Sequence, residues 1–225
     1  MLDALSVSIP VAAVGPVSGL WLRPPATRAC LVLAHGAGVG MAHKSMAALA
    51  DGLAQRHIAT LRFQFPYMEK GSGRPDSPPV AHVAVRAAVA EANRLAPDLA
   101  LFAGGRSFGG RMTSQAEALA PLTRVSGLVF FAFPLHPAGK PSIERAVHLA
   151  EVPVPMLFLQ GTRDALAEPD LLKTVAAGLS DRATLIQSED ADHSFHVAAR
   201  TGRKDADVLT RLLDDAAAWM VSHLP

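Results

Sequence analysis

Ser107 lies between two glycines, directly after an apolar run, in the segment Ala100-Leu-Phe-Ala-Gly-Gly-Arg-Ser-Phe-Gly-Gly110. This Gly-x-Ser-x-Gly spacing is typical of a nucleophile elbow, a sharp turn from a strand into a helix that exposes the serine hydroxyl. The backbone is strained at such a tip and neighbouring chains pass close to it, so glycines are needed two residues away on either side. The pattern predicts that Ser107 is a nucleophile. A glycine-rich turn with an idle serine is the alternative interpretation.

A serine nucleophile needs a base that takes its proton, and histidine is the usual base near neutral pH. His193 is the preferred candidate because it stands in a polar segment, Asp190-Ala-Asp-His-Ser-Phe195, after the last strand-like run. His196 follows closely and is the nearest rival. His43 is expected at the entrance of a helix. The histidines expected on solvated helix surfaces are His57, His82, His148 and His223.

An imidazole base needs a carboxylate that fixes its tautomer and stabilises its cation. Asp164 follows a strand-like run and a tight glycine turn, where such an acid belongs. Glu168, Asp190 and Asp192 compete for the role, and an aspartate after a strand is commonly just a turn or helix cap. The order serine, acid, histidine along the chain favours Asp164, because that order is used on this kind of sheet.

A second glycine-rich turn, Leu33-Ala-His-Gly-Ala-Gly-Val-Gly40, is suited to binding the oxyanion of a reacting carbonyl. We expect one backbone N–H donor from Phe108 and the other from Ala37 or a neighbour in this turn. A phosphate-binding loop is the competing interpretation because Lys44 follows, but the Gly-Lys-Ser/Thr ending and any dinucleotide fingerprint are missing. His35 is expected to be structural, beneath the turn.

A metal site is the other chemistry that these residues suggest. Asp190, Asp192, His193 and His196 could gather a divalent ion, but no second histidine cluster or cysteine pair completes such a site. We therefore expect no metal and no cofactor.

Short apolar runs alternate with longer amphipathic runs along the chain, and these elements must position the reactive groups. The expected strands are Val7–Val11, Gly19–Arg23, Cys30–Ala34, Thr60–Phe65, Leu99–Ala103, Gly127–Ala132, Met156–Gln160 and Thr184–Gln187. The expected helices are Lys44–Arg56, Val80–Leu95, Arg111–Leu119, Ile143–Leu149, Pro169–Leu179 and Asp205–His223. The first two strands read as a hairpin. The pattern predicts an α/β fold with a mostly parallel, twisted sheet of about eight strands, covered by helices on both faces, and a ligand site at the carboxyl ends of the strands.

The composition fits one domain over residues 1–225, because a chain of this length with 50% hydrophobic residues can bury a large single core. The net charge is +1 and the basic residues are scattered, which argues against a nucleic-acid partner. The single cysteine, Cys30, excludes a disulfide framework and is expected to be an inert core residue. The chain shows neither a signal peptide nor an apolar stretch long enough for a membrane span, so we expect a soluble cytoplasmic protein.

The segment 66–79 is expected to be irregular because of its prolines and glycines. A loop of this length either serves a site or is mobile, and whether it acts as a lid stays open. It follows a strand and emerges on the side of the site, so Tyr67, Arg74 and Asp76 are candidate substrate contacts.

Four of these segments, in order and each after a strand, resemble the α/β-hydrolase superfamily over nearly the whole chain. They are His35-Gly-Ala-Gly38, Gly105-Arg-Ser-Phe-Gly109, Gly161-Thr-Arg-Asp164 and Ala191-Asp-His193. The resemblance implies the α/β-hydrolase fold, with one antiparallel strand near the edge of the sheet. It also implies a triad of Ser107, Asp164 and His193.

The chain is similar, more specifically, to a small cap-less group of predicted hydrolases that includes the testis-expressed hydrolase-like proteins. The shared phrases are Gly104-Gly-Arg-Ser-Phe-Gly-Gly-Arg111, Phe63-Gln-Phe-Pro-Tyr67, Pro134-Leu-His-Pro-Ala-Gly-Lys-Pro141 and Leu159-Gln-Gly-Thr-Arg-Asp164. His136 in the third phrase is expected near the cleft, where it either binds substrate or holds its loop. Dienelactone hydrolases are also similar but commonly carry cysteine where Ser107 stands, which argues against their activity.

About twenty residues separate the strand Gly127–Ala132 from the next strand, which leaves no room for a sizeable cap domain.

From the four motifs in the expected order, we expect a serine hydrolase that cleaves a small-molecule carboxylic ester or thioester through an acyl-enzyme. A non-catalytic protein-interaction module on the same scaffold is the alternative, since some members of the closer group are thought to act mainly in protein assemblies. Arg74, Arg106 and Arg111 hint at an acidic substrate, although helix surfaces usually carry such charges. The acyl chain, the leaving group and the oligomeric state do not follow from the sequence.

Overall fold

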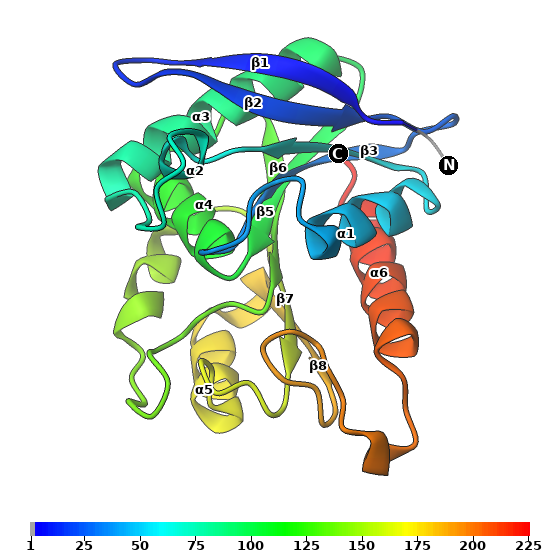
Figure 1. The fold of residues 1–225 in the computed structure, drawn as a ribbon. Coiled ribbons are helices and arrows are strands. Elements are labelled where there is room, and N and C mark those ends of the chain that lie inside the picture. Colours follow the sequence, from blue (N-terminus) through cyan, green and yellow to red (C-terminus); the bar gives the residue numbers. More distant parts are fainter. Residues whose placement is uncertain (1–2) are drawn as a thin grey trace.

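Eight strands form one sheet in the computed structural model, which describes residues 3–225. Met1 and Leu2, the first residues of the predicted 1–225 domain, lie outside the described part. The strands are β1 (Leu5–Val11), β2 (Gly15–Leu22), β3 (Ala29–Ala34), β4 (Ile58–Phe63), β5 (Ala100–Arg106), β6 (Val125–Phe131), β7 (Met156–Gly161) and β8 (Ala183–Ser188). Their order across the sheet is β1-β2-β4-β3-β5-β6-β7-β8 (Figure 1). β2 pairs antiparallel with both neighbours and every other pairing from β4 to β8 is parallel, so the expected antiparallel strand next to the edge is present.

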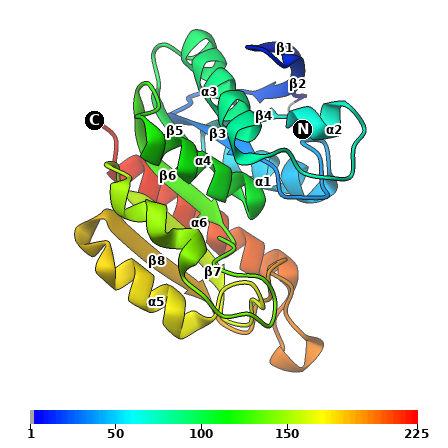
Figure 2. The ribbon, with the colours of Figure 1, turned by 90° about the vertical axis from the view of Figure 1, so that its left-hand side faces the viewer.

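Helices cover both faces of this sheet, as the alternation of strands and helices predicts (Figures 1 and 2). The helices are α1 (Lys44–Ala54), α2 (Pro66–Glu69), α3 (Pro78–Leu95), α4 (Phe108–Leu119), α5 (Pro169–Gly178) and α6 (Asp205–Ser222), with 3₁₀ helices η1 (Glu144–Glu151), η2 (Ser180–Arg182) and η3 (Ala199–Thr201). α1 and α6 lie on one face, and α3, α4, η1 and α5 lie on the other. This strand order, with an antiparallel strand next to the edge and helices on both faces, is that of the α/β-hydrolase fold, and no cap domain interrupts the described chain.

β3 illustrates why the central strands read as unbroken apolar runs. Successive side chains of a strand point to opposite faces of the sheet. Leu31 and Leu33 therefore join the core under α1 and α6, while Cys30 and Val32 join the core under α3 and α4. Burial raises the pKa of the Cys30 thiol to about 12, so it stays protonated and unreactive, as expected of a core cysteine.

Two segments differ from the sequence prediction. The segment 66–79, expected to be irregular throughout, begins with the short helix α2. Pro66 occupies its first position, where a missing N–H breaks no helical hydrogen bond, and Asp76 accepts a hydrogen bond from the Tyr67 N–H at 3.0 Å. The expected helix 143–149 is the 3₁₀ helix η1, whose buried residues Ala146 and Leu149 match its three-residue turn.

Glycines at the turn between β5 and α4 allow the backbone of β3 to approach closely. A Cβ atom on Gly105 would lie 2.3 Å from the carbonyl oxygen of Ala34, and one on Gly109 would lie 2.5 Å from that of His35. Both neighbours are backbone atoms in the central sheet or the turn after it, and they cannot move without disturbing several strands. The glycines of the Gly-x-Ser-x-Gly pattern are therefore required by packing.

We expect Gly105→Ala to lower the free energy of unfolding by about 3 kcal/mol, because the added methyl group overlaps the β3 backbone. Gly178→Ala in α5 is the matched control, since its Cβ meets no atom within 4 Å and alanine favours a helix by up to about 1 kcal/mol. Urea unfolding of both variants measures the difference. Equal midpoints for Gly105→Ala and the unmodified chain would contradict this account of the elbow.

Candidate active site

Ser107, Asp164 and His193 meet at the edge of the sheet where β5, β7 and β8 end. His193 Nε2 lies 2.8 Å from Ser107 Oγ, and His193 Nδ1 lies 2.7 Å from Asp164 Oδ2. With the ring proton on Nδ1, the imidazole donates to the carboxylate and accepts from the serine hydroxyl. The three side chains predicted from separate segments therefore form one continuous hydrogen-bonded chain.

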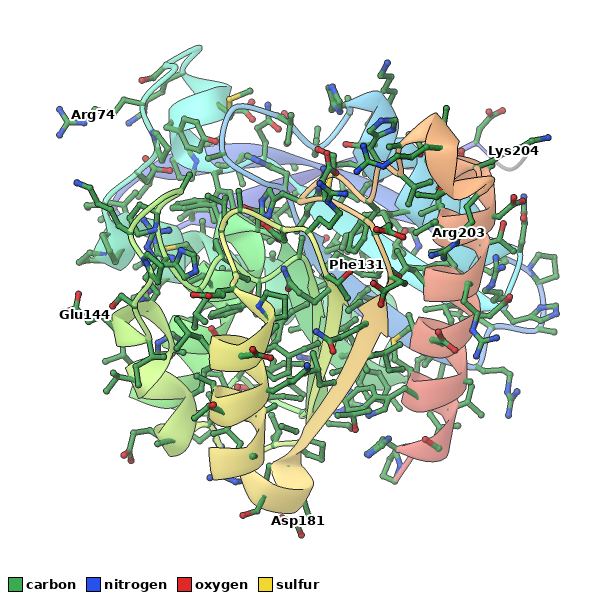
Figure 3. All side chains as sticks on the ribbon, turned by 90° about the horizontal axis from the view of Figure 1, so that it is seen from below. Arg74, Phe131, Glu144, Asp181, Arg203 and Lys204 are labelled. Atoms are coloured by element: carbon green, nitrogen blue, oxygen red, sulfur yellow. The ribbon has the colours of Figure 1, made fainter. Side chains whose placement is uncertain are left out.

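Ser107 stands in a strained conformation between β5 and α4. Its backbone angles are φ 50° and ψ −117°, outside the favoured regions for a residue with a side chain. Its N–H donates to the carbonyl oxygen of Phe131 at 3.0 Å, which fixes the turn to the end of β6. Phe131 is fully buried, and Figure 3 shows it near the centre of the view. The elbow is thus anchored in the central sheet and presents the hydroxyl beyond it.

Asp164 is completely buried at its side chain and held from three directions. Its Oδ1 accepts the backbone N–H of Leu166 at 2.8 Å, and its Oδ2 accepts from His193 and from the side-chain amide of Gln160. Gln160 was not predicted to be a site residue. A polar side chain inside the otherwise apolar β7 is the signal that could have identified it. These contacts fix the orientation of the carboxylate towards the imidazole.

The loop that carries His193 is shaped by Asp192, one of the competing acids. Asp192 Oδ1 accepts the backbone N–H groups of Ser194 and His196 at 2.7 and 3.0 Å, so this carboxylate holds the loop instead of the imidazole. The rival base His196 is 62% exposed at its side chain and pairs with Asp205 at 2.9 Å. That hydrogen bond raises the pKa of His196, and no contact joins it to Ser107 in the described structure.

The other two competing acids also have different partners. Asp190 lies 4.0 Å from Arg163 on the surface, and its N–H donates to Thr162 Oγ1. Glu168 directly precedes α5, its side chain makes no capping hydrogen bond, and its N–H donates to His136 Nε2 at 3.0 Å. Neither carboxylate is hydrogen-bonded to the imidazole of His193.

A cleft of about 430 Å³ opens beside Ser107 and His193. Gly36 and Ala37 of the turn after β3 line it on one side. Phe108 is the first residue of α4, and its N–H has no partner within the helix. The N–H groups of Ala37 and Phe108 form no backbone hydrogen bond in the part of the chain that the structure describes, so both are free to donate to a ligand.

The two weaker substrate-binding candidates lie below the surface. Tyr67 is 3% exposed and packs its ring on Phe65 and Phe108, under the elbow. His136 is also 3% exposed, and both of its ring nitrogens bond to backbone: Nδ1–H donates to Pro137 and Nε2 accepts from Glu168. This arrangement favours the interpretation that His136 holds its loop.

Two histidines predicted to be solvated are packed inside. His82 is buried between α3 and α4, where its Nε2 lies 3.2 Å from Gln115 Oε1. His148 is partly buried in η1 and bonds to Ser114 Oγ at 2.8 Å. The surface prediction was wrong for both because the buried faces of α3 and α4 carry mainly alanine, glycine and serine, so that these helices and η1 pack against one another. His43 caps α1, accepting the Ser45 N–H at 3.2 Å, as expected of a helix entrance.

His35 supports the turn after β3 from beneath. It is fully buried, its Nε2 accepts the N–H of Phe65 at 3.0 Å, and its Nδ1–H donates to the carbonyl of Gly36 at 2.9 Å. Burial lowers the pKa of His35 to about 4. Burial, together with the nearby Arg111 and His82, also lowers the pKa of His148 to about 4. Both rings are therefore neutral at physiological pH.

We expect the free energy of unfolding to fall as the pH is lowered from about 6.5 to about 4. In that window the unfolded chain protonates His35 and His148 while the folded chain does not, so the unfolded state binds more protons and is favoured. The buried His35 contributes a slope of up to about 1.4 kcal/mol per pH unit. Denaturant unfolding at several pH values measures the slope, which should become shallower in His148→Gln. Stability that stays constant on acidification would contradict the prediction.

The described residues contain no group of three or more His, Cys, Asp and Glu side chains placed to hold a metal ion. Of the four residues considered for a metal, His193 faces Ser107 while His196 faces Asp205. Within residues 3–225, no helix combines the length and the apolar character needed to cross a membrane.

The sequence and the fold both resemble known proteins. A family described as an alpha/beta hydrolase domain matches residues 27–221. The structure is similar to a dienelactone hydrolase from Anabaena variabilis, with a TM-score of 0.76, 20% identity, and coverage of 100% of this chain and 99% of that one. It is also similar to an α/β serine hydrolase without a lid from Xanthomonas campestris, with a TM-score of 0.73, 22% identity, and coverage of 99% and 96%. The esterase domain of a Rhodothermus marinus protein matches with a TM-score of 0.75, 14% identity, and coverage of 100% of both chains.

Proposed function

We propose that this chain, which belongs to the alpha/beta hydrolase domain family, is a serine hydrolase. Its proposed substrate is a carboxylic ester or thioester of a small molecule. The observation that carries the proposal is the hydrogen-bonded chain from Ser107 through His193 to Asp164, with distances of 2.8 and 2.7 Å. We further propose that residues 1–225 act as one domain and that the protein stands close to the cap-less, testis-expressed hydrolase-like group.

The first half of the reaction forms an acyl-enzyme. Ser107 Oγ attacks the carbonyl carbon while His193 Nε2 takes the hydroxyl proton, and Asp164 stabilises the resulting imidazolium. The N–H groups of Phe108 and Ala37 donate to the oxygen of the tetrahedral intermediate, which carries the negative charge. When the intermediate collapses, the bond to the alcohol or thiol breaks, and the leaving group receives the proton from Nε2.

The second half restores the enzyme. A water molecule attacks the carbonyl carbon of the acyl-enzyme, and His193 Nε2 takes its proton. The new tetrahedral intermediate is again bound by the two backbone N–H groups. Its collapse breaks the bond to Ser107 Oγ, which regains a proton from the imidazole, and the carboxylic acid is released. The open cleft, without a cap domain above it, suits small acyl groups that enter directly from solvent.

A fluorophosphonate probe tests the proposal, because it reacts with an activated serine hydroxyl. We expect one equivalent of label on Ser107 in the folded protein, no label in Ser107→Ala, and normal labelling in Ser194→Ala. Ser194 lines the same cleft, but among the described residues its hydroxyl forms no hydrogen bond with His193, so it is a matched control. A folded protein that takes up no label and cleaves no nitrophenyl ester would instead support the non-catalytic interaction module.

A further inference from the structure

Arg106 is the last residue of β5 and directly precedes the serine of the elbow. Its partly buried side chain lines the cleft beside Ser107 and also a smaller adjoining pocket of about 120 Å³. Phe195 and Leu209 give the smaller pocket apolar walls, and Asp205, whose carboxylate is paired with His196, also lines it. The positively charged Arg106 side chain therefore lies between the cleft and the smaller pocket, next to the hydroxyl of Ser107.

The Arg106 guanidinium has no hydrogen-bond acceptor and no ion-pair partner among residues 3–225; only burial and distant charges act on it. Two other buried or partly buried arginines donate to backbone carbonyls, whereas Arg111, away from the cleft, resembles Arg106 in leaving a guanidinium nitrogen without a partner. Arg62 donates to Met41 at 3.1 Å, and Arg86 donates to Ala120 at 2.9 Å. Even partial burial of a guanidinium without a protein partner costs free energy. The fold thus leaves the bonding capacity of Arg106 unused.

The nearest carboxylates do not neutralise this cation at contact distance. Asp192 and Asp164 attract Arg106 from further away. Both are already engaged, because Asp192 accepts two backbone N–H groups and Asp164 accepts from His193. Burial lowers the pKa of Arg106, yet a guanidinium remains charged at neutral pH.

The cleft contains a second positively charged side chain. Lys44, the first residue of α1, lines the cleft, and no Asp or Glu side chain does so among the described residues. The first turn of α1 also contains no acidic residue, and the N–H groups at a helix start favour a negative charge. A negatively charged ligand would therefore meet attraction both at the rim and beside the serine.

The structure separates the three arginines that suggested an acidic substrate. Figure 3 shows Arg74 projecting outward from the molecule, and its side chain is exposed. Arg111 lies in α4 beside Arg145 and His148, and it does not line the cleft. Of the three, Arg106 is the one that lines the cleft.

We propose that the substrate carries an anionic group, a carboxylate or a phosphate, and that Arg106 binds this group near the scissile carbonyl while Lys44 attracts it at the rim. This inference rests on the proposed hydrolase function and narrows it to charged substrates. The planar guanidinium can donate two parallel hydrogen bonds to the oxygens of either group. Arg106 is thus a specificity-determining residue.

Two pairs of substrates test the inference, each pair differing by one charged group. The first pair compares the 4-nitrophenyl monoester of adipate with 4-nitrophenyl hexanoate, which lacks the carboxylate on the acyl chain. The second pair compares acetyl phosphopantetheine with acetyl pantetheine, which lacks the phosphate on the leaving thiol. For each pair, kcat/KM is measured with the unmodified protein and with Arg106→Gln, Lys44→Gln and Arg74→Gln, at low and at moderate salt.

We expect the unmodified protein to prefer the charged member of at least one pair by about tenfold or more. Arg106→Gln should lose most of that preference, chiefly through a higher KM for the charged substrate. Lys44→Gln should reduce the preference by a few-fold and weaken its dependence on salt, because Lys44 is exposed. Arg74→Gln, remote from the cleft, should keep the preference. The pair that responds identifies the group as carboxylate or phosphate.

The inference would be overturned if the unmodified protein had nearly the same kcat/KM for the charged and the neutral member of both pairs. It would also be overturned if Arg106→Gln left the ratio of these two values unchanged. Both outcomes leave the hydrolase function standing, since the neutral substrates are still cleaved. If Arg106→Gln does not fold, the deciding measurement is fluorophosphonate labelling of the unmodified protein, which adipate or inorganic phosphate should slow; unaltered labelling overturns the inference. If no substrate is cleaved and Ser107 takes up no label, the inference and the proposed function fail together.

Discussion

Ser107→Ala is expected to lower kcat/KM for ester hydrolysis by on the order of 10⁴-fold or more. The methyl group cannot attack a carbonyl, and without the hydroxyl the imidazole of His193 has no nucleophile to deprotonate. Residual turnover should remain, because the N–H groups of Ala37 and Phe108 can still bind the oxyanion of a substrate attacked by water.

The measurement is initial-rate hydrolysis of a nitrophenyl ester, corrected for the spontaneous reaction. The control is thermal unfolding, which should occur at the same temperature in Ser107→Ala as in the unmodified protein. The hydrogen bond from the Ser107 backbone N–H to the Phe131 carbonyl does not involve the side chain and is kept in the variant. Turnover that is unchanged in a folded Ser107→Ala protein would mean that another residue is the nucleophile.

Asp164→Asn is expected to lower kcat/KM at neutral pH by about 10⁴-fold, although it changes few atoms. In the variant the side-chain oxygen would still accept the Leu166 N–H, which turns the amide NH₂ towards His193 Nδ1. The imidazole would then carry its proton on Nε2 and donate to Ser107 instead of accepting from it. The base would be in the wrong tautomer for proton abstraction.

Asp190→Asn is the matched control for this change. Asp190 is an aspartate of the same site loop, but its nearest cation is Arg163 at 4.0 Å and both groups are largely exposed. We expect its kcat/KM to stay within about twofold of the unmodified value, because such exposed pairs contribute little. A large loss in Asp190→Asn, or a small one in Asp164→Asn, would show that a different acid orients the histidine.

The sheet was predictable because local residue patterns specify it. Buried parallel strands read as apolar runs since both faces are covered, and each of the eight predicted runs corresponds to a strand of the structure. The elbow was predictable for a related reason. Gly105 and Gly109 are imposed by contacts with the β3 backbone, so the packing requirement leaves its mark in the sequence itself.

The departures come from contacts between segments distant in sequence. α2 forms where a loop was expected because Asp76 bonds back to Tyr67, a contact that prolines and glycines alone do not reveal. His82 reads as a surface residue, yet it is buried where α3 packs on α4. Helix periodicity could have placed His82 next to the buried alanines of α3, but the choice between a surface and a buried histidine depends on the partner Gln115.

The same limit applies to the candidate site. The order of the motifs suggested Ser107, Asp164 and His193 because each follows a strand end, and parallel strand ends share one edge of a sheet. Gln160 and Asp192 position these groups through contacts that depend on the folded loops. The isolation of Arg106 could not be read from the sequence, since it depends on what every neighbouring carboxylate already binds.

The most direct measurement of the central claim is a mutant cycle on kcat/KM with Ser107→Ala, Asp164→Asn and the double variant. If the three side chains act as a single unit, the double variant should be no slower than Ser107→Ala alone, because the acid has no role once the nucleophile is gone. Multiplicative losses, with the double variant slower by the product of the two single effects, would contradict the account.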